Sequence, residues 1–454
     1  MALKNQWIRP HPLMRSTNGV MMLLPPFVFE NRRDRVKASL PDGAVAIVAA
    51  HAEVVRSRDS DYPFRQSSDF WYLTGFTEPD AVLILQHGVP DRLVVRPNDP
   101  AAEVWTGRRL GPERVRSRLG IPDAHPLNAL DALMDEALAN ADRVEYPFDC
   151  IRSTRLAEAA FQRVRGQGRK RQLLSHRVDL GLTLHRHRQV KSPEEIDLMR
   201  KAGQISARGH LAAMRQVEPG MTEDQLASIV EHSFRMDGSP SVAYQTIVGG
   251  GENACILHYV DRSDRLRSGD LVLIDAGCEW GGYAGDITRT FPVNGQFSGA
   301  QRELYDIVLA AQTAALADVR PGLSIRAYHE TAIRVLTQGL LDLKILTGTL
   351  ADAIETKAYL PYYMHGTGHL LGLDVHDVGF YEDNGSPIAL QPGMVVTVEP
   401  GLYISQHSDA PARYRGIGIR IEDDVVVTTT GHEVLSGDVP KDPDAIEVLM
   451  KDRC

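Results

Sequence analysis

Four acidic residues and one histidine in the C-terminal half of the chain lie at the ends of apolar segments or inside them. They are Asp275, Asp286, His369, Glu399 and Glu422. Glu399 directly follows an apolar run and Glu422 lies within one, and carboxylates in such places are seldom buried without a partner. For each acid alone, a turn-forming, strand-end or surface carboxylate is the alternative interpretation. Together, the five side chains are candidate ligands for metal ions.

Four carboxylates and one imidazole form a hard, oxygen-rich ligand set. Such ligands suit manganese or magnesium, and the imidazole also admits zinc, cobalt or iron. Two divalent cations would neutralise the four carboxylates, whereas one would leave the site strongly negative. Two such ions, about 3.5–4 Å apart, could share a bridging hydroxide that attacks a carbonyl near neutral pH. From the ligands alone, a two-metal phosphatase or nuclease stays open beside a peptidase.

The pair His365 and His369 has the spacing of the zinc-binding helix motif HExxH. Gly366 and Gly368 disfavour a helix there and the motif's glutamate is missing, so we expect a glycine-rich loop that delivers one imidazole. Strict alternation over residues 416–422 places Arg420 on the same face as the acid that ends the segment. Arg420 is therefore a candidate for steadying a ligand carboxylate.

These residues must be positioned by strands. Residues 271–274 form an apolar run that ends at Asp275, and Asp286 opens the alternating segment 287–291. A hairpin would bring the two acids face to face, where like charges repel unless a cation or a shared proton lies between them. We therefore predict a hairpin with its two acids at the site.

Helix-capping signals indicate that this half of the chain is internally duplicated. Capping boxes pair Ser192 with Glu195, Thr222 with Gln225, and Ser298 with Gln301. The turns at 217–222 and 319–324 share the pattern V-x-P-G-[M/L]-[S/T], each between a capped helix and a second helical segment. We predict that residues 178–454 form two related α+β halves with a ligand site where the halves meet.

The N-terminal part has the mixed pattern of an α/β domain. We expect an irregular lead over 1–25, a domain over 26–178 and a catalytic domain over 179–454. Expected strands cover 45–48, 70–73, 81–85 and 93–95, and expected helices cover 27–40, 112–119 and 127–139. Two basic stretches, 163–171 and 185–191, are interpreted as a solvated linker rather than a nucleic-acid patch.

Composition narrows the class of protein. A chain of 454 residues favours two domains, and 43% hydrophobic with 24% charged residues is typical of soluble globular proteins. The net charge of −9 argues against nucleic-acid and anionic-membrane partners. Four scattered cysteines favour a reducing compartment. Prolines interrupt the apolar run at 19–29 and no segment has the length of a membrane span, so we expect a cytoplasmic protein.

Five ordered motifs resemble those of the pita-bread metallopeptidases, which include methionine aminopeptidase, prolidase and Xaa-Pro aminopeptidase. They are 274–277 (IDAG), 285–291 (GDITRTF), 365–369 (HGTGH), 398–401 (VEPG) and 418–422 (GIRIE). Residues 64–76 resemble the creatinase-type N-terminal domain of the last two groups. The sequences of segments 282–286 and 414–420 are most similar to those of Xaa-Pro aminopeptidases. The resemblance implies an α/β N-terminal domain followed by an α+β pita-bread catalytic domain with an internal pseudo-two-fold duplication.

The resemblance also implies a role for each candidate residue. It makes the four acids and the histidine the metal ligands, with Asp286 and Glu422 bridging two metals and Glu399 acting also as general base or acid. His258 and His376 match histidines that contact substrate or shuttle protons. The remaining implied substrate-binding residues are His365, Arg420, Tyr403 and Trp105. Trp105 matches a tryptophan that reaches a neighbouring subunit's active site, and a core aromatic is the alternative.

The implied function is a dinuclear metal-dependent Xaa-Pro aminopeptidase. It would remove the N-terminal residue from peptides with proline in second position, by attack of a metal-bridging hydroxide, with Glu399 protonating the leaving nitrogen. Manganese is the expected metal, with zinc, cobalt or magnesium as alternatives, and a dimer or tetramer is the expected assembly. A prolidase that cleaves Xaa-Pro dipeptides, a metal-free pita-bread binding protein and a creatinase-like hydrolase are the alternatives.

Overall fold

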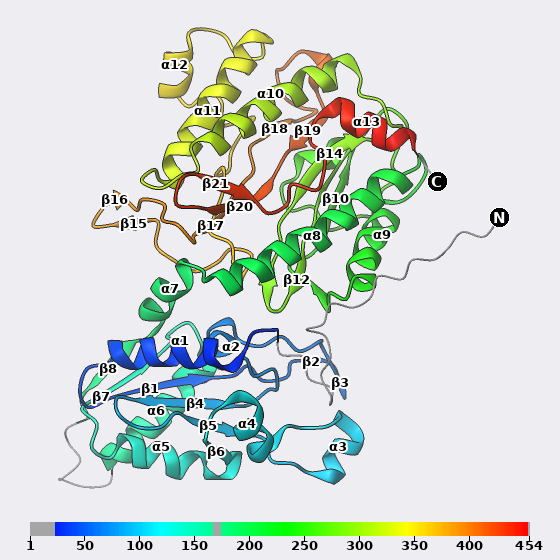
Figure 1. Cartoon of the computed structure of the whole chain (residues 1–454). Helices are drawn as coiled ribbons and strands as arrows, with labels where there is room; N and C mark the ends of the chain where they lie inside the picture. The colour runs from blue at the N-terminus through cyan, green and yellow to red at the C-terminus, as the bar shows by residue number, and fades with distance from the viewer. Residues whose placement is uncertain (1–22, 167–173, 453–454) are drawn as a thin grey trace. The chain divides into compact units, whose positions relative to one another are not determined.

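The computed structural model describes residues 23–166 and 174–452 (Figure 1). Of the expected irregular lead, residues 1–22 lie outside this described part. The chain divides into two compact units, Met1–Leu184 and His185–Cys454, here called unit 1 and unit 2. The division falls within helix α7 (Gly181–Gln189), a few residues after position 178.

Unit 1 is built on a six-stranded mixed sheet with the strand order β6-β5-β4-β1-β7-β8. Its strands are β1 (Ala44–Ala49), β4 (Val82–Gln86), β5 (Arg92–Val95), β6 (Asp123–Pro126), β7 (Arg143–Tyr146) and β8 (His176–Asp179). Strand β1 is buried along its whole length, because it runs antiparallel to β4 on one side and parallel to β7 on the other, with helices over both faces. Helix α1 lies on one face of this sheet and α5 on the other (Figure 1).

The helices of unit 1 include those expected from the sequence. They are α1 (Pro26–Ser39), α2 (Ser68–Thr74), α3 (Pro100–Thr106), α4 (Gly111–Leu119), α5 (Leu130–Leu138) and α6 (Ile151–Gly166), and a short hairpin is formed by β2 (Val55–Ser57) and β3 (Ser60–Asp61). The expected strand at 70–73 is wrong, because these residues lie in α2. A short apolar run fits a buried strand or a buried helix equally well. The hydroxyl of Ser67 caps the helix and Gly75, at φ 63°, ends it.

Unit 2 repeats one order of elements twice, as the sequence predicted. Each half begins with two helices that pack against each other and continues into an antiparallel three-stranded sheet, β10-β11-β14 in the first half and β17-β20-β21 in the second. The three predicted capping boxes are all present. The fold therefore is an α/β domain followed by a duplicated α+β domain.

The first half contains α8 (Pro193–Gln216), α9 (Glu223–Met236), β9 (Ser241–Val242), β10 (Ile247–Gly250), β11 (Leu271–Asp275), β12 (Cys278–Trp280), β13 (Tyr283–Ala284) and β14 (Thr288–Pro292). The second half contains α10 (Gly299–Ala317), α11 (Ile325–Asp342), α12 (Leu350–Glu355), β15 (Glu382–Asp383), β16 (Ser386–Pro387), β17 (Val395–Val398), β18 (Gly401–Ile404), β19 (Ile417–Arg420), β20 (Asp423–Val427), β21 (His432–Val434) and α13 (Pro443–Lys451).

A buried arginine joins the two halves. Arg289 of β14 is fully buried, and its Nη2 lies 2.7 Å from Oδ1 of Asp423 in β20. Its Nη1 donates to the backbone oxygens of Thr288 and Glu422. The guanidinium therefore fastens β14 to the segment that carries a candidate ligand of the second half.

The basic stretch 185–191 is not a solvated linker. Its first part belongs to α7, and Arg188, Gln189 and Lys191 are buried. Of the other basic stretch, the described residues belong to α6, and 167–171 lie outside the described part. Charge runs usually face water, but here Asp377, a buried carboxylate of unit 2, binds both Arg188 and Lys191. Among the described residues, no helix combines the length and the apolar character needed to cross a membrane.

Candidate metal centre

The two acids of the first half approach each other without facing each other across a hairpin. Asp275 ends β11 and pairs in register with Thr288 of β14, while Asp286 precedes β14 after the small β12–β13 hairpin. The expected face-to-face register is therefore wrong. Their carboxylates nevertheless lie close together. The hydroxyl of Tyr244 lies 2.5 Å from an oxygen of each.

The second half supplies the imidazole from a loop, as expected. Residues 365–369 form no helix, and a Cβ on Gly368 would lie 2.0 Å from the carbonyl oxygen of Thr397. His369 is fixed on β17 because its backbone N–H donates to the Thr397 hydroxyl at 3.1 Å. Its Nδ1 lies 3.0 Å from the carbonyl oxygen of Leu370, which leaves Nε2 to face the acids.

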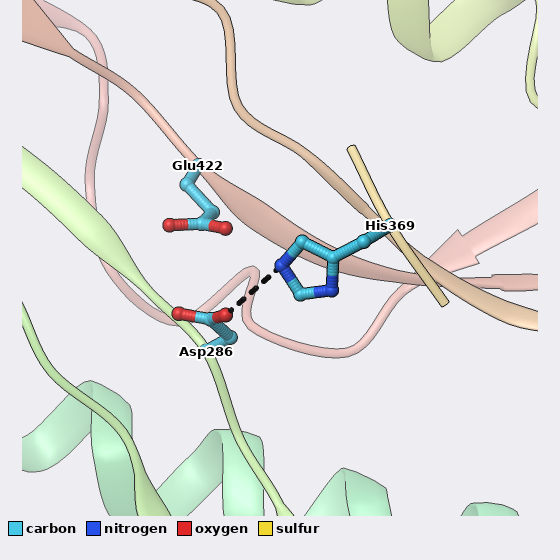
Figure 2. Close-up of side chains that lie close together, drawn as sticks. All are labelled: Asp286, His369 and Glu422. Carbon is cyan, nitrogen blue, oxygen red and sulfur yellow. Dashed lines mark ion pairs between the residues drawn. The ribbon is translucent and has the colours of Figure 1, made fainter. Parts of the chain in front are cut away.

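Ligand atoms from both halves meet at one place. Nε2 of His369 lies 3.5 Å from Oδ2 of Asp286 and 3.6 Å from Oε1 of Glu399. Ligand atoms of Asp286, His369 and Glu422 all lie within 4.8 Å of one another. Figure 2 shows these three side chains pointing toward one another from three separate segments. Such a convergence of two carboxylates and an imidazole is suited to a divalent cation.

The electrostatics of the cluster agree with a cation site. Burial, and after it the charge of Asp275, raises the pKa of Asp286. Burial and then Asp286 raise the pKa of Glu422, and burial raises the pKa of Glu399 to about 7. Burial lowers the pKa of His369, but Asp286 and Glu399 outweigh it and raise that pKa to about 9. The ionised acids thus need more positive charge than the protein supplies, and divalent cations would provide it.

Arg420 organises the acids, as the strand alternation suggested. Its Nη2 lies 2.6 Å from Oδ2 of Asp275, and its Nε donates to the hydroxyl of Thr288 at 3.1 Å. That hydroxyl in turn donates to Oε2 of Glu422 at 2.6 Å. Arg420 therefore contacts one candidate ligand directly and steadies another through Thr288.

A chain of polar contacts leads from Arg420 to a histidine of the loop. Nη1 of Arg420 donates to the Tyr403 hydroxyl at 3.0 Å, and that hydroxyl lies 2.8 Å from Nε2 of His365. Burial and then Arg420 lower the pKa of His365 to about 3, so its imidazole is neutral. Nδ1 of the same ring lies 2.6 Å from the Gly366 carbonyl, so Nδ1 donates there and Nε2 accepts from Tyr403.

These residues surround a cavity of about 630 Å³. Its polar lining includes all five candidate ligands together with His258, His365, His376 and Arg420. Its apolar wall is formed by Ile247, Leu257, Val260, Val375 and Tyr381. The His376 ring stands at 80° to that of His369 with centroids 4.4 Å apart, and burial followed by His369 lowers its pKa. The space combines converging polar groups with an apolar wall, as ligand-binding pockets commonly do.

Two predicted substrate-binding residues lie outside this lining. Tyr403 is buried next to the lining, where its hydroxyl connects Arg420 with His365. Trp105 belongs to α3 of unit 1 and is 87% exposed, so the alternative of a core aromatic is wrong.

Several polar groups that hold the ligands were not among the site residues predicted from the sequence. These are Tyr244, Thr288, Thr397 and Asp424, whose Oδ2 accepts the backbone N–H of Asp286 at 3.0 Å. The alternation of 287–291 could have marked Thr288 as lying on the site face. A single aromatic in a loop, such as Tyr244, carries no comparable local signal.

Replacement of Tyr244 by phenylalanine is expected to weaken Mn²⁺ binding by about 10- to 100-fold, because its hydroxyl orients both Asp275 and Asp286. Calorimetric titration of the apoprotein measures this. Tyr305→Phe is the matched control, since its hydroxyl donates only to the Lys441 carbonyl among the contacts described. Equal Mn²⁺ affinity in the Tyr244 variant and the wild type would contradict the role.

Models of two known protein families match this chain. The model of metallopeptidase family M24 matches residues 197–429, which include all five candidate ligands. The chain belongs to metallopeptidase family M24. The model of the aminopeptidase P N-terminal domain matches residues 29–145. Both parts of the predicted architecture, including the pita-bread catalytic domain, are thereby confirmed.

Individual relatives cover nearly the whole chain. Xaa-Pro aminopeptidase of Escherichia coli K12 is 46% identical over 436 residues, which span 93% of this chain and 97% of that protein. The Xaa-Pro aminopeptidase of Haemophilus influenzae is 44% identical over 435 residues, which span 95% of this chain and 98% of that protein. Among solved structures, proline aminopeptidase P II from Yersinia pestis has a TM-score of 0.92 and 47% identity, covering 94% of this chain and all of that one. A Glu-to-Ala variant of E. coli aminopeptidase P in complex with substrate has a TM-score of 0.91 and 45% identity, covering 94% of this chain and 98% of that one.

Proposed function

We propose that this member of family M24 is an Xaa-Pro aminopeptidase that holds two divalent metal ions and releases the N-terminal residue from peptides with proline in second position. The convergence of Asp275, Asp286, His369, Glu399 and Glu422 on one cavity carries the proposal. The names of the relatives that match over the full chain support the substrate class. Mn²⁺ is the proposed metal because the ligand set is rich in carboxylates.

The five ligands would hold the ions, with Asp286 and Glu422 bridging them. When bound, the ions supply Lewis acidity and activate water near neutral pH. Glu399 faces the cavity and its Oε1 accepts a hydrogen bond from the Thr397 hydroxyl at 3.3 Å. It is the proposed acid that delivers a proton to the departing proline nitrogen, since an amide anion would be a poor leaving group.

Substrate would be oriented by the histidines and by the apolar wall. His258 and His376 both line the cavity and are the proposed contacts to the carbonyl oxygen or the attacking water. A prolyl nitrogen in a peptide bond carries no hydrogen, so recognition of proline depends on the shape of its ring and on apolar contact. The neutral His365 with Tyr403 and Arg420 would border the proline and the residues beyond it.

A series of substrates of different length tests this function. With Mn²⁺ present, Xaa-Pro-Xaa tripeptides and longer peptides should lose the first residue, and a chelator should abolish the cleavage. Cleavage restricted to Xaa-Pro dipeptides would instead support a prolidase. A protein that binds no metal in elemental analysis would support the binding-protein alternative and contradict the proposal.

We further propose a homo-oligomer in a reducing, cytoplasmic setting, in which Trp105 contacts substrate bound by a neighbouring subunit. The side chain is 87% exposed on a helix with no buried residue. The cysteines among the described residues, Cys150, Cys255 and Cys278, form no disulfide.

Trp105→Ala is expected to raise KM for tripeptides about 30-fold while kcat changes little, since a tryptophan at the centre of a contact contributes about 2 kcal/mol. Steady-state kinetics and sedimentation measure this. Val104→Ala, at the similarly exposed neighbouring position (80%), is the control. A monomeric wild-type protein with full activity would contradict the shared site.

A further inference from the structure

The buried basic segment after Leu184 binds the loop that carries His376. Nη2 of Arg188 lies 2.6 Å from Oδ1 of Asp377 and 2.7 Å from Oδ2 of Asp374. Nζ of Lys191 lies 2.9 Å from the other Asp377 oxygen, Oδ2. These four residues, Arg188, Lys191, Asp374 and Asp377, are called the brace. It joins the start of unit 2 to a loop almost two hundred residues later in the chain.

The brace is balanced in charge, and three of its four side chains are shielded from water, while Asp374 is 37% exposed. The side chains of Arg188, Lys191 and Asp377 are only 3%, 1% and 1% exposed. Burial raises the pKa of Asp377, but Lys191 and then Arg188 outweigh it and lower that pKa, so the carboxylate is ionised. Buried ions of this kind hold a defined geometry, because any displacement leaves a charge without its partner.

Further hydrogen bonds from the segment of Arg188 and Lys191 hold the same loop. The Gln189 side chain donates to the Phe380 carbonyl at 2.9 Å and accepts from the Phe380 N–H at 3.2 Å. The backbone N–H of Lys191 donates to the Gly393 carbonyl at 2.8 Å. A Cβ on Gly372 would lie 2.1 Å from Oδ2 of Asp377, so the loop can pack this closely on the carboxylate only with glycine there. The loop of residues 374–380 is therefore held at its start by Arg188 and at its end by Gln189.

His376 precedes the braced Asp377 directly and lines the cavity. The candidate metal ligands are supported mainly by other groups, namely Tyr244, Thr288 and Thr397. The backbone N–H of Asp377 shares the Leu370 carbonyl oxygen with Nδ1 of His369, at 2.9 and 3.0 Å. A change in the brace acts on the Asp377 side chain rather than on this carbonyl, so it should displace His376 and leave the metal ions bound.

We propose that Arg188 and Lys191 are positioning residues that act through Asp377 to set the place of the His376 imidazole in the active site. Neither cation lines the cavity. The proposal rests on the proposed function, in which His376 contacts the reacting groups.

Lys191→Met is the central test, because it removes one partner of Asp377 without changing the length of the side chain greatly. With a Xaa-Pro-Xaa tripeptide and Mn²⁺, kcat should fall about 10- to 100-fold while the metal content stays at the wild-type value. Lys191→Arg should recover most of the loss, since it restores the cation. In a His376→Ala background, Lys191→Met should cause no further loss, because the residue through which it acts is gone.

Unit 1 contains a similar cluster, one buried aspartate with an arginine and a lysine, that serves as a control. Asp91 there binds Arg33 at 2.6 Å and Lys37 at 2.7 Å. Lys37→Met removes the equivalent ammonium group far along the sequence from the loop, and kcat should stay within twofold of the wild type.

Hydrogen exchange supplies a readout that does not depend on activity. In Lys191→Met, the amides of residues 374–380 should exchange at least tenfold faster, and those of β17 should not change. If Lys191→Met does not fold, Gln189→Ala takes its place, because it removes two bonds to Phe380 and strands no buried charge. It should lower kcat about 3- to 10-fold and accelerate the same amides.

Three results would overturn the proposal. They are a kcat of the brace variants within twofold of the wild type, a loss that multiplies with that of His376→Ala, and exchange of 374–380 at the wild-type rate. A wild-type protein that cleaves no Xaa-Pro peptide would refute the proposed function instead, and the exchange measurement would still decide whether the brace holds the loop.

Discussion

Asp286→Asn is expected to lower kcat/KM by at least about 10³-fold and to reduce the metal content of the purified protein. The carboxylate lies at the centre of the site, between Tyr244 and His369, and is 4% exposed. Asparagine keeps the shape but removes the charge that would bind a cation, and the stabilisation supplied by a metal at the reacting centre amounts to several kcal/mol. Elemental analysis and steady-state kinetics measure the two effects.

The control for this variant is Asp306→Asn, an exposed carboxylate that pairs with Arg302 at 2.9 Å on α10. It should retain the full metal content and activity. An Asp286→Asn protein with wild-type metal content and kcat/KM within tenfold of the wild type would contradict the assignment of Asp286 as a ligand. Circular dichroism should be unchanged in both variants, because neither substitution alters side-chain size.

Arg289→Met is expected to lower the free energy of unfolding of unit 2 by about 3–5 kcal/mol, because it leaves Asp423 buried with one cation fewer. Both side chains of the pair are fully buried at a distance of 2.7 Å. The guanidinium also donates to the backbone oxygens of Val439 and Pro440, which would lose their donor. Urea unfolding measures the change in the free energy of unfolding, and hydrogen exchange of the β14 amides measures the local effect.

An exposed ion pair provides the comparison for Arg289. Arg326 and Glu330 lie one helical turn apart on α11, with side chains 66% and 62% exposed. Arg326→Met should change the free energy of unfolding by less than about 0.5 kcal/mol, because water screens the pair. Losses of equal size in the two variants would show that burial of the Arg289 pair has no special importance.

The sequence predicted those features whose signals are local. Capping boxes at Ser192, Thr222 and Ser298 each lie within four residues, and each begins a helix. The acids that follow apolar runs, Asp275 and Glu399, lie at the ends of strands because the run itself is the buried strand. The glycines of 365–369 excluded a helix there. Each of these inferences depends on neighbours in the chain, so no knowledge of distant segments was needed.

Errors arose where a short pattern had two solutions. Residues 70–73 fit a strand or a helix, and a cap before them with a glycine after them selected the helix. Asp275 and Asp286 were expected to face each other, but the small β12–β13 hairpin shifts the register, so that Asp275 pairs with Thr288. The spacing of charges predicted a solvated segment at 185–191. That prediction failed because the carboxylate that binds the buried Lys191 lies far along the chain, at position 377.

Sequence alone therefore determined the identity of the metal-ligand candidates, the duplicated order of elements and, through the five motifs, the family. Only the tertiary structure decided which hydroxyls hold those ligands in place and which cations hold the loop that carries His376. Tyr244 and the brace act on residues that are between 31 and 189 positions away in the chain. The physical reason is that helix caps and strand periodicity depend on local backbone geometry, whereas a hydroxyl or a guanidinium finds its partner only after distant strands have packed together.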